Sequence, residues 1–175
     1  MSATKLRYFT QQIPFTSSWS ANVLTCTTAA NYLVSGDVIT LTAQDSPQEL
    51  VKVVVTVIDS THFTVPASSL YSYWTKGDAH IKFYRTGQTG QFTMTLPRSS
   101  GNSAVVQSFV SGSGGATYVL EASLDGVHWA TLATVTHAGT DGDNQYVAIE
   151  PAWTYIGIQI SSIGASTSMA VMTSA

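Results

Sequence analysis

The chain has 175 residues, of which 44% are hydrophobic and only 10% charged, and its formal net charge is -3 at pH 7. An average soluble domain has about 25% charged residues, so uncharged side chains fill most polar positions of this chain. The hydrophobic content excludes a disordered protein. The seven lysines and arginines form no cluster, which argues against binding to nucleic acid or to an anionic membrane. We expect a folded protein of one large domain or two modest ones.

The compartment is indicated by the cysteine content and by the apolar runs. A single cysteine, Cys26, cannot form an internal disulfide, as expected for a protein assembled in a reducing cytoplasm. We expect Cys26 to be a small buried hydrophobic residue and not a nucleophile. Polar residues follow Lys5 and Arg7, so we predict no signal peptide. The longest apolar run, 53–58, is far shorter than the roughly 20 residues that cross a bilayer.

The first twenty residues are rich in large apolar side chains. Tyr8, Phe9, Phe15 and Trp19 all lie in this segment, which is too apolar to extend freely into solvent. We predict residues 1–20 to be an N-terminal arm that packs on its own domain or on a neighbouring subunit. The four aromatic side chains are therefore candidate interface residues.

Residues 21–88 have the pattern of a small β-barrel. Apolar residues alternate with polar ones, and turn residues such as Gly36-Asp37 and Asp59-Ser60 separate the runs, which is typical of short strands joined by turns. The run Val51–Ile58 places alternate valines on one face, so we expect at least one side of it to be buried. We predict strands at Asn22–Thr27, Val38–Thr42, Val51–Ile58, His62–Val65 and His80–Tyr84.

A polar, glycine-containing segment, Thr86–Gly90, separates this pattern from a second one that begins with Phe92, Met94 and Leu96. We place a domain boundary there and predict that residues 89–175 form a jelly roll or β-sandwich. Asp125-Gly126 is a hairpin signal, because this pair readily adopts positive φ. We predict the further strands at Ala104–Val110, Thr117–Leu124, His128–Thr136, Tyr146–Ile149, Tyr155–Ser161 and Ser168–Thr173. The fold class is therefore all-β.

Two stretches resemble known modules. Val34–Leu41 with Val53–Val65 is similar to small β-modules of tailed-bacteriophage virion proteins, in which a Gly-Asp turn opens one strand and an Asp-Ser-Thr-x-Phe-Thr-Val turn closes another. Leu120–Leu132 is similar to the Ser-x-Asp-Gly-x-x-Trp hairpin of jelly-roll and sandwich modules in phage capsid and tail proteins. The resemblance implies a virion structural protein. Composition and spacing by themselves imply only an all-β assembly module.

Catalysis receives little support from the sequence. There is no Gly-x-Ser-x-Gly motif, which a serine hydrolase with a nucleophile elbow would need. The histidines at positions 62, 80, 128 and 137 are scattered along the chain. Glu121, Asp125 and Glu150 are the plausible carboxyl groups for a glycosidase, but Asp125 is already explained by its turn. We expect a protein that is not an enzyme, with no catalytic residues and no cofactor.

One loop has side chains that could hold calcium. The loop His137–Gln145 concentrates Asp141, Asp143 and Asn144, and such oxygen ligands can hold calcium. The loop does not follow the EF-hand pattern, and no spacing of cysteine and histidine favours zinc. We therefore expect a plain solvated turn and no metal.

The aromatic cluster Tyr71, Tyr73 and Trp74 is the strongest sign of a binding surface. In an extended segment the two tyrosines share one face, and such rigid aromatic area is enriched at protein interfaces. The same rings could stack on sugars, or they could close the bottom of the barrel. We add all three to the candidate interface residues.

Three functional hypotheses follow. The favoured one is a capsid decoration, or cement, protein that is assembled in the host cytoplasm and sits on the capsid surface of the virion, where it bridges subunits of the major capsid protein. We expect it to be a homo-oligomer, with a trimer favoured because capsid lattices offer threefold positions. A tail, adaptor or head-fibre component is the second hypothesis. A carbohydrate-binding module for the host surface is the third.

Overall fold

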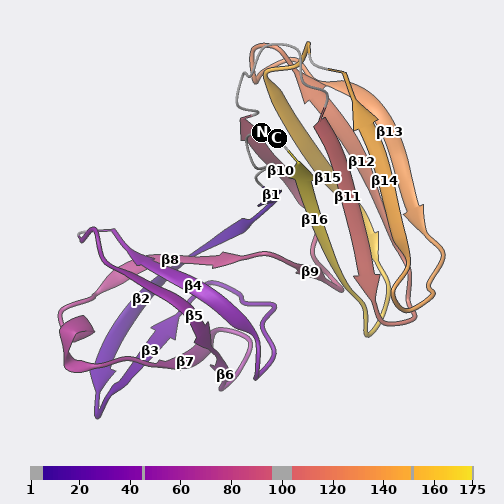
Figure 1. The fold of residues 1–175 in the computed structure, drawn as a ribbon. Helices are drawn as coiled ribbons and strands as arrows, with labels where there is room; N and C mark the ends of the chain where they lie inside the picture. The colour runs from indigo at the N-terminus through magenta and orange to yellow at the C-terminus, as the bar shows by residue number, and fades with distance from the viewer. Residues whose placement is uncertain (1–5, 45, 96–103, 151, 175) are drawn as a thin grey trace. The chain divides into compact units, whose positions relative to one another are not determined.

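A computed structural model describes residues 6–44, 46–95, 104–150 and 152–174 (Figure 1). The fold is all-β, as predicted, and these described residues include one short 3-10 turn at Ser69–Tyr71. It divides into two compact units. One comprises Gln11–Ile81, and the other combines the segment that ends at Thr10 with the chain from Lys82 onwards. No helix of the described residues is long and apolar enough to cross a membrane.

The order of these units along the chain differs from the expected order. The first unit is inserted into the second, because the chain leaves the second unit after Thr10 and re-enters it at Lys82. The expected arm over residues 1–20 is therefore divided, and its second half is a strand of the inserted unit. The expected boundary at Thr86–Gly90 lies inside the second unit, because Tyr84–Arg85 is already one of its strands.

The inserted unit is a nearly closed barrel made of one antiparallel sheet in the order β5-β4-β8-β2-β3-β7-β6. Its two end strands, β5 and β6, are separated in the chain only by Val55. One bent segment therefore pairs with β4 through its first half and with β7 through its second. The bounds are β2 (Gln11–Ser20), β3 (Val23–Thr27), β4 (Val38–Ala43), β5 (Glu49–Val54), β6 (Thr56–Val57), β7 (His62–Pro66) and β8 (Lys76–Ile81).

Alternate side chains of the strands point inward and fill the interior of the barrel. Leu24 and Cys26 point inward from β3, and Phe63 and Val65 point inward from β7, as the period of two in a strand requires. The expected regular strand over residues 51–58 is interrupted. Lys52 has a φ of 56° and lies in a bulge opposite β4. The bulge resets the alternation, so Val51 is exposed although Val55 is buried.

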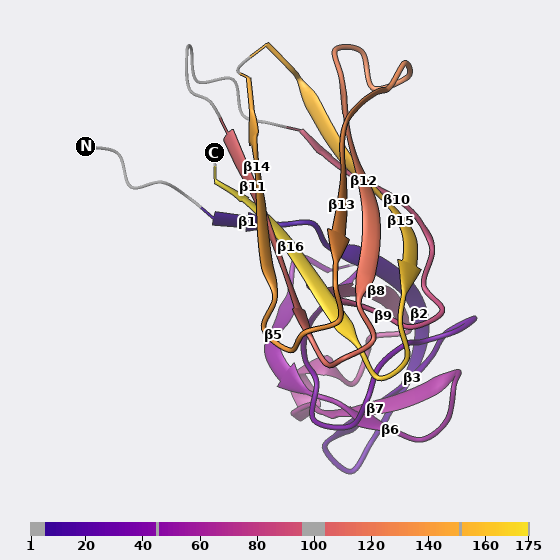
Figure 2. The ribbon, with the colours of Figure 1, turned by 90° about the vertical axis from the view of Figure 1, so that its right-hand side faces the viewer.

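The second unit is a jelly roll with two sheets, which lie as two layers in Figure 2. One sheet has the order β1-β16-β11-β14, with β9 also paired to β16, and the other has the order β10-β15-β12-β13. This order is that of a two-sheet jelly roll, one of the two folds expected from the sequence for this part of the chain. The bounds are β1 (Leu6–Tyr8), β9 (Tyr84–Arg85), β10 (Gly90–Thr95), β11 (Ala104–Ser111), β12 (Ala116–Ser123), β13 (Ala130–His137), β14 (Asn144–Ile149), β15 (Tyr155–Ile163) and β16 (Ser168–Ser174).

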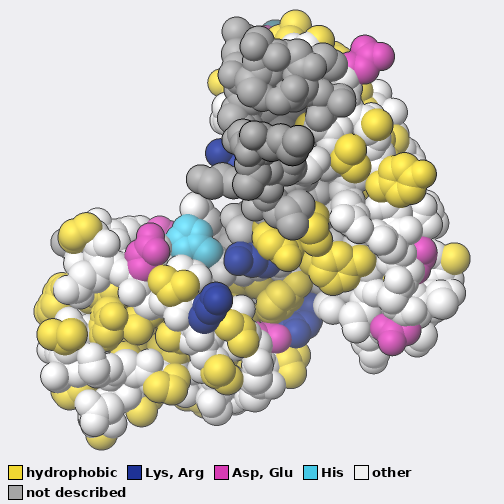
Figure 3. Space-filling view, viewed as in Figure 1, with side chains coloured by type: hydrophobic (Ala, Val, Ile, Leu, Met, Phe, Trp, Pro, Cys, Tyr) yellow, Lys and Arg dark blue, Asp and Glu magenta, His cyan; other side chains and the backbone are white. Residues whose placement is uncertain are grey.

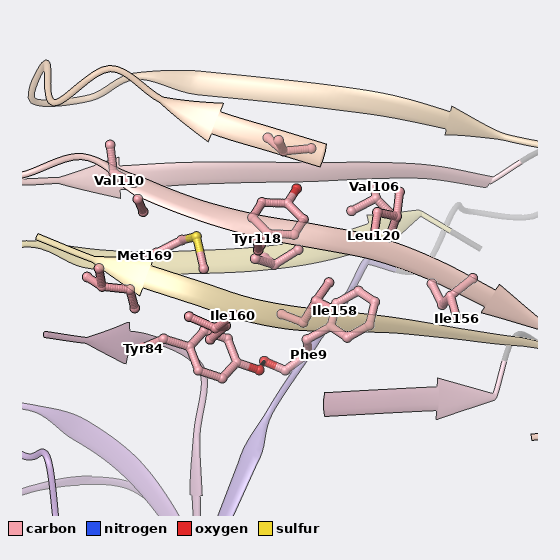
Figure 4. Packing of buried hydrophobic residues seen from close by; sticks show 14 of the residues in the cluster. Phe9, Tyr84, Val106, Val110, Tyr118, Leu120, Ile156, Ile158, Ile160 and Met169 are labelled. Carbon is pink, nitrogen blue, oxygen red and sulfur yellow. Dashed lines mark hydrogen bonds between the residues drawn. The ribbon is translucent and has the colours of Figure 1, made fainter. Parts of the chain in front are cut away.

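The edge strand of the first sheet is assembled from two distant segments. β1 pairs with the C-terminal half of β16, and β9 pairs with its N-terminal half, both antiparallel. Between them, the Phe9 N–H donates to the Val171 carbonyl at 2.9 Å, and the Tyr84 hydroxyl donates to the Phe9 carbonyl at 3.0 Å. Figure 4 shows both rings among the buried side chains. The barrel is therefore inserted into the first strand of the jelly roll.

Candidate functional site

Three of the seven expected interface residues are core residues. Phe15 and Trp74 are buried inside the barrel unit, and Phe9 is buried in the jelly roll. Each of these side chains is almost fully removed from solvent by its own chain, so it has no surface to offer a partner. The expectation that they form an interface is corrected. The reason is the same in each case, because a large apolar ring gains more from a closed core than from an exposed position.

The remaining expected residues of the barrel are anchored at its surface. The Trp19 indole donates to the Ala67 carbonyl at 2.8 Å, and the Tyr71 ring packs edge-on against Trp74 with centroids 5.1 Å apart. Tyr73 is 56% exposed and donates to the Gln48 side chain at 2.6 Å. The hollow beside Tyr73 and Trp74 has a volume of only about 20 Å³. That space holds about one water molecule, so the hollow itself does not enclose a sugar ring.

Tyr8, the last of the seven expected interface residues, lies in a groove on the outer face of the jelly roll. This groove has a volume of about 280 Å³. Its floor is the first part of β16, where Ser168 and Ala170 face outward. On one side, Phe109 of β11 pairs in register with Ala170. The other side is formed by β1, β9 and the residues before β9. The lining consists of Tyr8, Lys82, Phe83, Arg85, Phe109, Ser168, Met169 and Ala170.

Two cations lie on aromatic rings at this groove. The Lys82 ammonium is 5.0 Å from the centre of the Tyr8 ring, and the Arg85 guanidinium is 4.5 Å from the centre of the Phe83 ring. Both distances lie within the range of about 6 Å in which a ring attracts a cation. The lining contains no acidic residue. The groove therefore combines aromatic surface with positive charge, in a chain whose net charge is negative.

A second surface is the outer side of strands β4 and β5 in the barrel. Val38 and Val54 lie directly opposite each other in the ladder and are 54% and 51% exposed. Val51 of β5, Val34 in the turn before β4 and Ile58 directly after β6 are exposed as well. Figure 3 shows hydrophobic side chains spread over the visible face of the barrel, with few charges among them. We call Val34, Val38, Val51, Val54 and Ile58 the aliphatic face.

One set of side chains has the composition of a serine hydrolase triad. Ser108 Oγ lies 2.9 Å from His137 Nε2, and His137 Nδ1 lies 3.2 Å from Asp143 Oδ2. The Tyr118 hydroxyl also donates to Ser108 Oγ at 2.9 Å. Ser108 and His137 come from different strands and match no local motif, so this set could not be predicted from the sequence.

The triad-like set is built as part of the core. Ser108 and Tyr118 have no exposed surface, and His137 is almost completely buried. His137 Nδ1 makes no well-aligned hydrogen bond despite its proximity to Asp143. A nucleophile must reach a substrate, and a base must be oriented by a third group. Ser108 is inaccessible and His137 is poorly oriented, so the set acts as a buried polar network that links β11, β12 and β13.

His62 and His128 lie in two turns that have the same local structure. In Asp59-Ser-Thr-His62 and in Asp125-Gly-Val-His128, the aspartate accepts backbone N–H bonds from the second and third residues after it. Its carboxylate also contacts the histidine ring, at 2.9 Å in the first turn and 2.7 Å in the second. At Asp125 the bonds from the His128 side chain and backbone lower the pKa of the carboxyl, and the carboxylate raises the pKa of His128.

The carboxylates of the Asp141 to Asn144 loop bond to the chain itself. Asp141 accepts a bond from the Gly112 N–H at 2.8 Å, and Asp143 accepts one from the Ala138 N–H at 3.2 Å. Nowhere in the described part of the chain do three histidine, cysteine, aspartate or glutamate side chains gather as metal ligands would. The loop has the geometry of a hydrogen-bonded turn.

The groove and the aliphatic face are thus the two candidate binding surfaces. Of the residues that line the groove, only Tyr8 was expected from the sequence to lie at an interface. The other lining residues are single residues of short or distant strands. The Phe109 side chain could have been noticed as a large outward-facing residue of an otherwise regular alternation. A comparison of the sequence with models of known protein families found no match, and a comparison with curated proteins found none either.

Proposed function

We propose that this chain is a non-enzymatic structural protein of a tailed-bacteriophage virion, and that it decorates the capsid by binding the major capsid protein. The proposal for a virion rests on the resemblance of the barrel and hairpin segments to virion modules. The exposed aliphatic face of the barrel is the observation that carries the proposal for attachment. Apolar surface that a folded chain leaves uncovered commonly marks a site of protein association.

Charge supports the same type of contact. The chain has few charged residues, and the five members of the aliphatic face are all uncharged. Binding by such a surface comes mainly from burial of apolar area. It should therefore persist when salt screens exposed ion pairs.

The proposed decoration protein acts as a homo-oligomer, for which a trimer fits the threefold positions of a capsid best. A single aliphatic face of five side chains gives a weak contact. Three copies held together would bind with an avidity well above that of one copy, provided that all three contacts can form at once. Analytical ultracentrifugation of the purified chain tests this part, since a strict monomer at the concentrations of assembly would contradict it.

Co-sedimentation with undecorated capsids tests the attachment. We expect the chain to sediment with capsids at low salt and also at about 1 M salt, where the Debye length is only about 3 Å. The double substitution Val38→Lys and Val54→Lys should abolish co-sedimentation of the chain with capsids, because it places two charges on the aliphatic face. Val127→Lys is the matched control, since Val127 is 73% exposed in a turn of the jelly roll.

The result can contradict the proposal in two ways. Loss of binding only at high salt would show that ion pairs, and not the aliphatic face, hold the protein. Absence of binding at both salt concentrations would move the chain to a tail, adaptor or head-fibre position. Those components number a few to a few tens per particle, whereas the resemblance to capsid decoration proteins implies hundreds of copies.

Binding of carbohydrate at the host surface is the second candidate function. In the cluster of Tyr71, Tyr73 and Trp74, the Trp74 ring is buried and the hollow beside it is small, so Tyr73 is the ring that remains mostly exposed for stacking on a sugar. The groove of the jelly roll gives this function a new and separate basis.

A further inference from the structure

We propose that the groove on the outer face of the jelly roll binds one acidic sugar residue. The inference does not rest on capsid attachment, because the groove and the aliphatic face belong to different units of the chain. Of the residues that line the groove, only Tyr8 was expected from the sequence, and it was expected as a protein-interface residue.

The size and shape of the groove limit the ligand. Its volume of about 280 Å³ is just below the roughly 300 to 1,000 Å³ typical of small-molecule sites. A single six-membered ring with its substituents fits this space better than a long chain does. Ser168 and Ala170 keep the floor low, because both are small and both face outward from β16. A larger residue at either position would fill the groove.

The wall formed by Phe109 supplies a surface for stacking. Its side chain is 38% exposed and lies across from Ala170 in the ladder of β11 and β16. No cation lies on this ring among the cation–ring pairs of the described residues, in contrast to the rings of Tyr8 and Phe83. The C–H face of a sugar ring can pack on it and remove apolar area of both from water.

The opposite wall carries two positively charged side chains that aromatic rings already hold in place. Lys82 and Arg85 lie on the rings of Tyr8 and Phe83, and these contacts restrict the two long side chains before a ligand arrives. Restricting them beforehand lowers the entropy cost of binding. A carboxylate matches the planar guanidinium of Arg85 in a two-bond geometry. With two cations and no acid in the lining, an acidic sugar complements the groove better than a neutral one.

Titration of the full chain with glucuronate, followed by amide shifts in nuclear magnetic resonance spectra, tests the proposal. We expect shifts at Ser168, Met169, Ala170 and Phe109, and affinity for glucuronate about tenfold or more above that for glucose, because a hydrogen bond to a charged group contributes more than a neutral one. Arg85→Gln should reduce the affinity for glucuronate toward that for glucose. Phe109→Ala should weaken the binding of both sugars.

Matched variants outside the groove separate these effects from a general loss of structure. Lys52→Gln removes an exposed positive charge from the barrel, and Tyr146→Ala removes a ring that is 78% exposed on β14. Neither should change the binding of glucuronate. Equal affinity for glucose and glucuronate would overturn the role of Lys82 and Arg85. The proposal fails as a whole if acetate shifts the same amides as strongly as glucuronate, or if a short acidic peptide binds the groove and glucuronate does not.

Discussion

The substitution Phe9→Ala tests the unusual connection between the two units. Phe9 lies near the N-terminus, but its ring is 1% exposed in the core of the jelly roll, most of which comes from residues after position 100. Replacement of a buried phenylalanine by alanine typically costs about 3 to 5 kcal/mol. The jelly roll has about 100 residues, and in a domain of that size each kcal/mol lowers Tm by about 4 to 8 °C. We expect its Tm to fall by at least about 12 °C.

Hydrogen exchange measured by mass spectrometry assigns the loss to one unit. Phe9→Ala should accelerate exchange in β11, β12 and β16 and leave β3, β4 and β7 unchanged. Phe15→Ala is the matched control, because this phenylalanine is only six positions further on but is buried in the barrel. It should accelerate exchange in β3, β4 and β7 and spare the jelly roll. If Phe9→Ala loosened the barrel strands instead, the insertion of the barrel into the first jelly-roll strand would be refuted.

Three further predictions concern single side chains. Burial raises the pKa of the Cys26 thiol to about 12, so a thiol reagent at pH 8 should modify the folded protein only at the rate at which the barrel opens, and rapid modification without denaturant would contradict the packing of β3. The pKa of Asp125 is lowered by its bonds from His128 and from the Val127 N–H, so its contribution to stability is present above the ordinary aspartate pKa of about 3.9 and is lost as pH falls below it. Asp125→Asn should therefore lower Tm at pH 7 and reduce the loss of Tm between pH 5 and pH 2, and an unchanged acid profile would show that this turn does not matter. Ser108 is inaccessible, so a fluorophosphonate probe for serine hydrolases should not label the native chain, whereas labelling of Ser108 would make the triad-like set a working active site.

Much of the fold follows from local sequence patterns. The turns at Gly36-Asp37, Asp59-Ser60 and Asp125-Gly126 separate runs of period two, and strands lie close to nearly all of the predicted positions from Asn22 onwards. Two predicted strands are exceptions. Val51–Ile58 is divided between β5 and β6, and His80–Tyr84 is divided because residues 80–81 end β8 and Tyr84 begins β9. Turn residues and alternating apolar side chains are signals that extend over only a few residues. They can therefore be recognised in a single sequence.

The N-terminal strands could not be predicted in the same way. In β2, Gln11 is buried although it is polar, and Pro14 lies within the strand, so the segment does not read as a strand. Pro14 is tolerated because β2 pairs only with β8 at that point, which leaves the other side of the backbone without a ladder to interrupt. β1 and β9 are three and two residues long. Their shared partner β16 lies far along the chain, and no local pattern indicates that pairing.

The candidate surfaces depend on which side of a strand faces solvent. The bulge at Lys52 turns Val51 outward and creates part of the aliphatic face. The 3-10 turn at Ser69–Tyr71 replaces the extended segment that would have placed Tyr71 and Tyr73 on one face, and it lets Trp74 enter the core. The bulge interrupts β5, and the 3-10 turn lies in the connection between β7 and β8. A shift of one residue exchanges the buried and the exposed faces, so the interface residues were harder to predict than the strands.

Electron cryomicroscopy of capsids with and without the added chain tests the central proposal most directly. We expect additional density on the outer capsid surface, in copies related by threefold or quasi-threefold symmetry, with β4 and β5 of the barrel facing the major capsid protein. Capsids mixed with the chain carrying Val38→Lys and Val54→Lys should lack this density. Density confined to the tail or to fibres, or a bare capsid surface at saturating protein, would contradict the assignment as a capsid decoration protein.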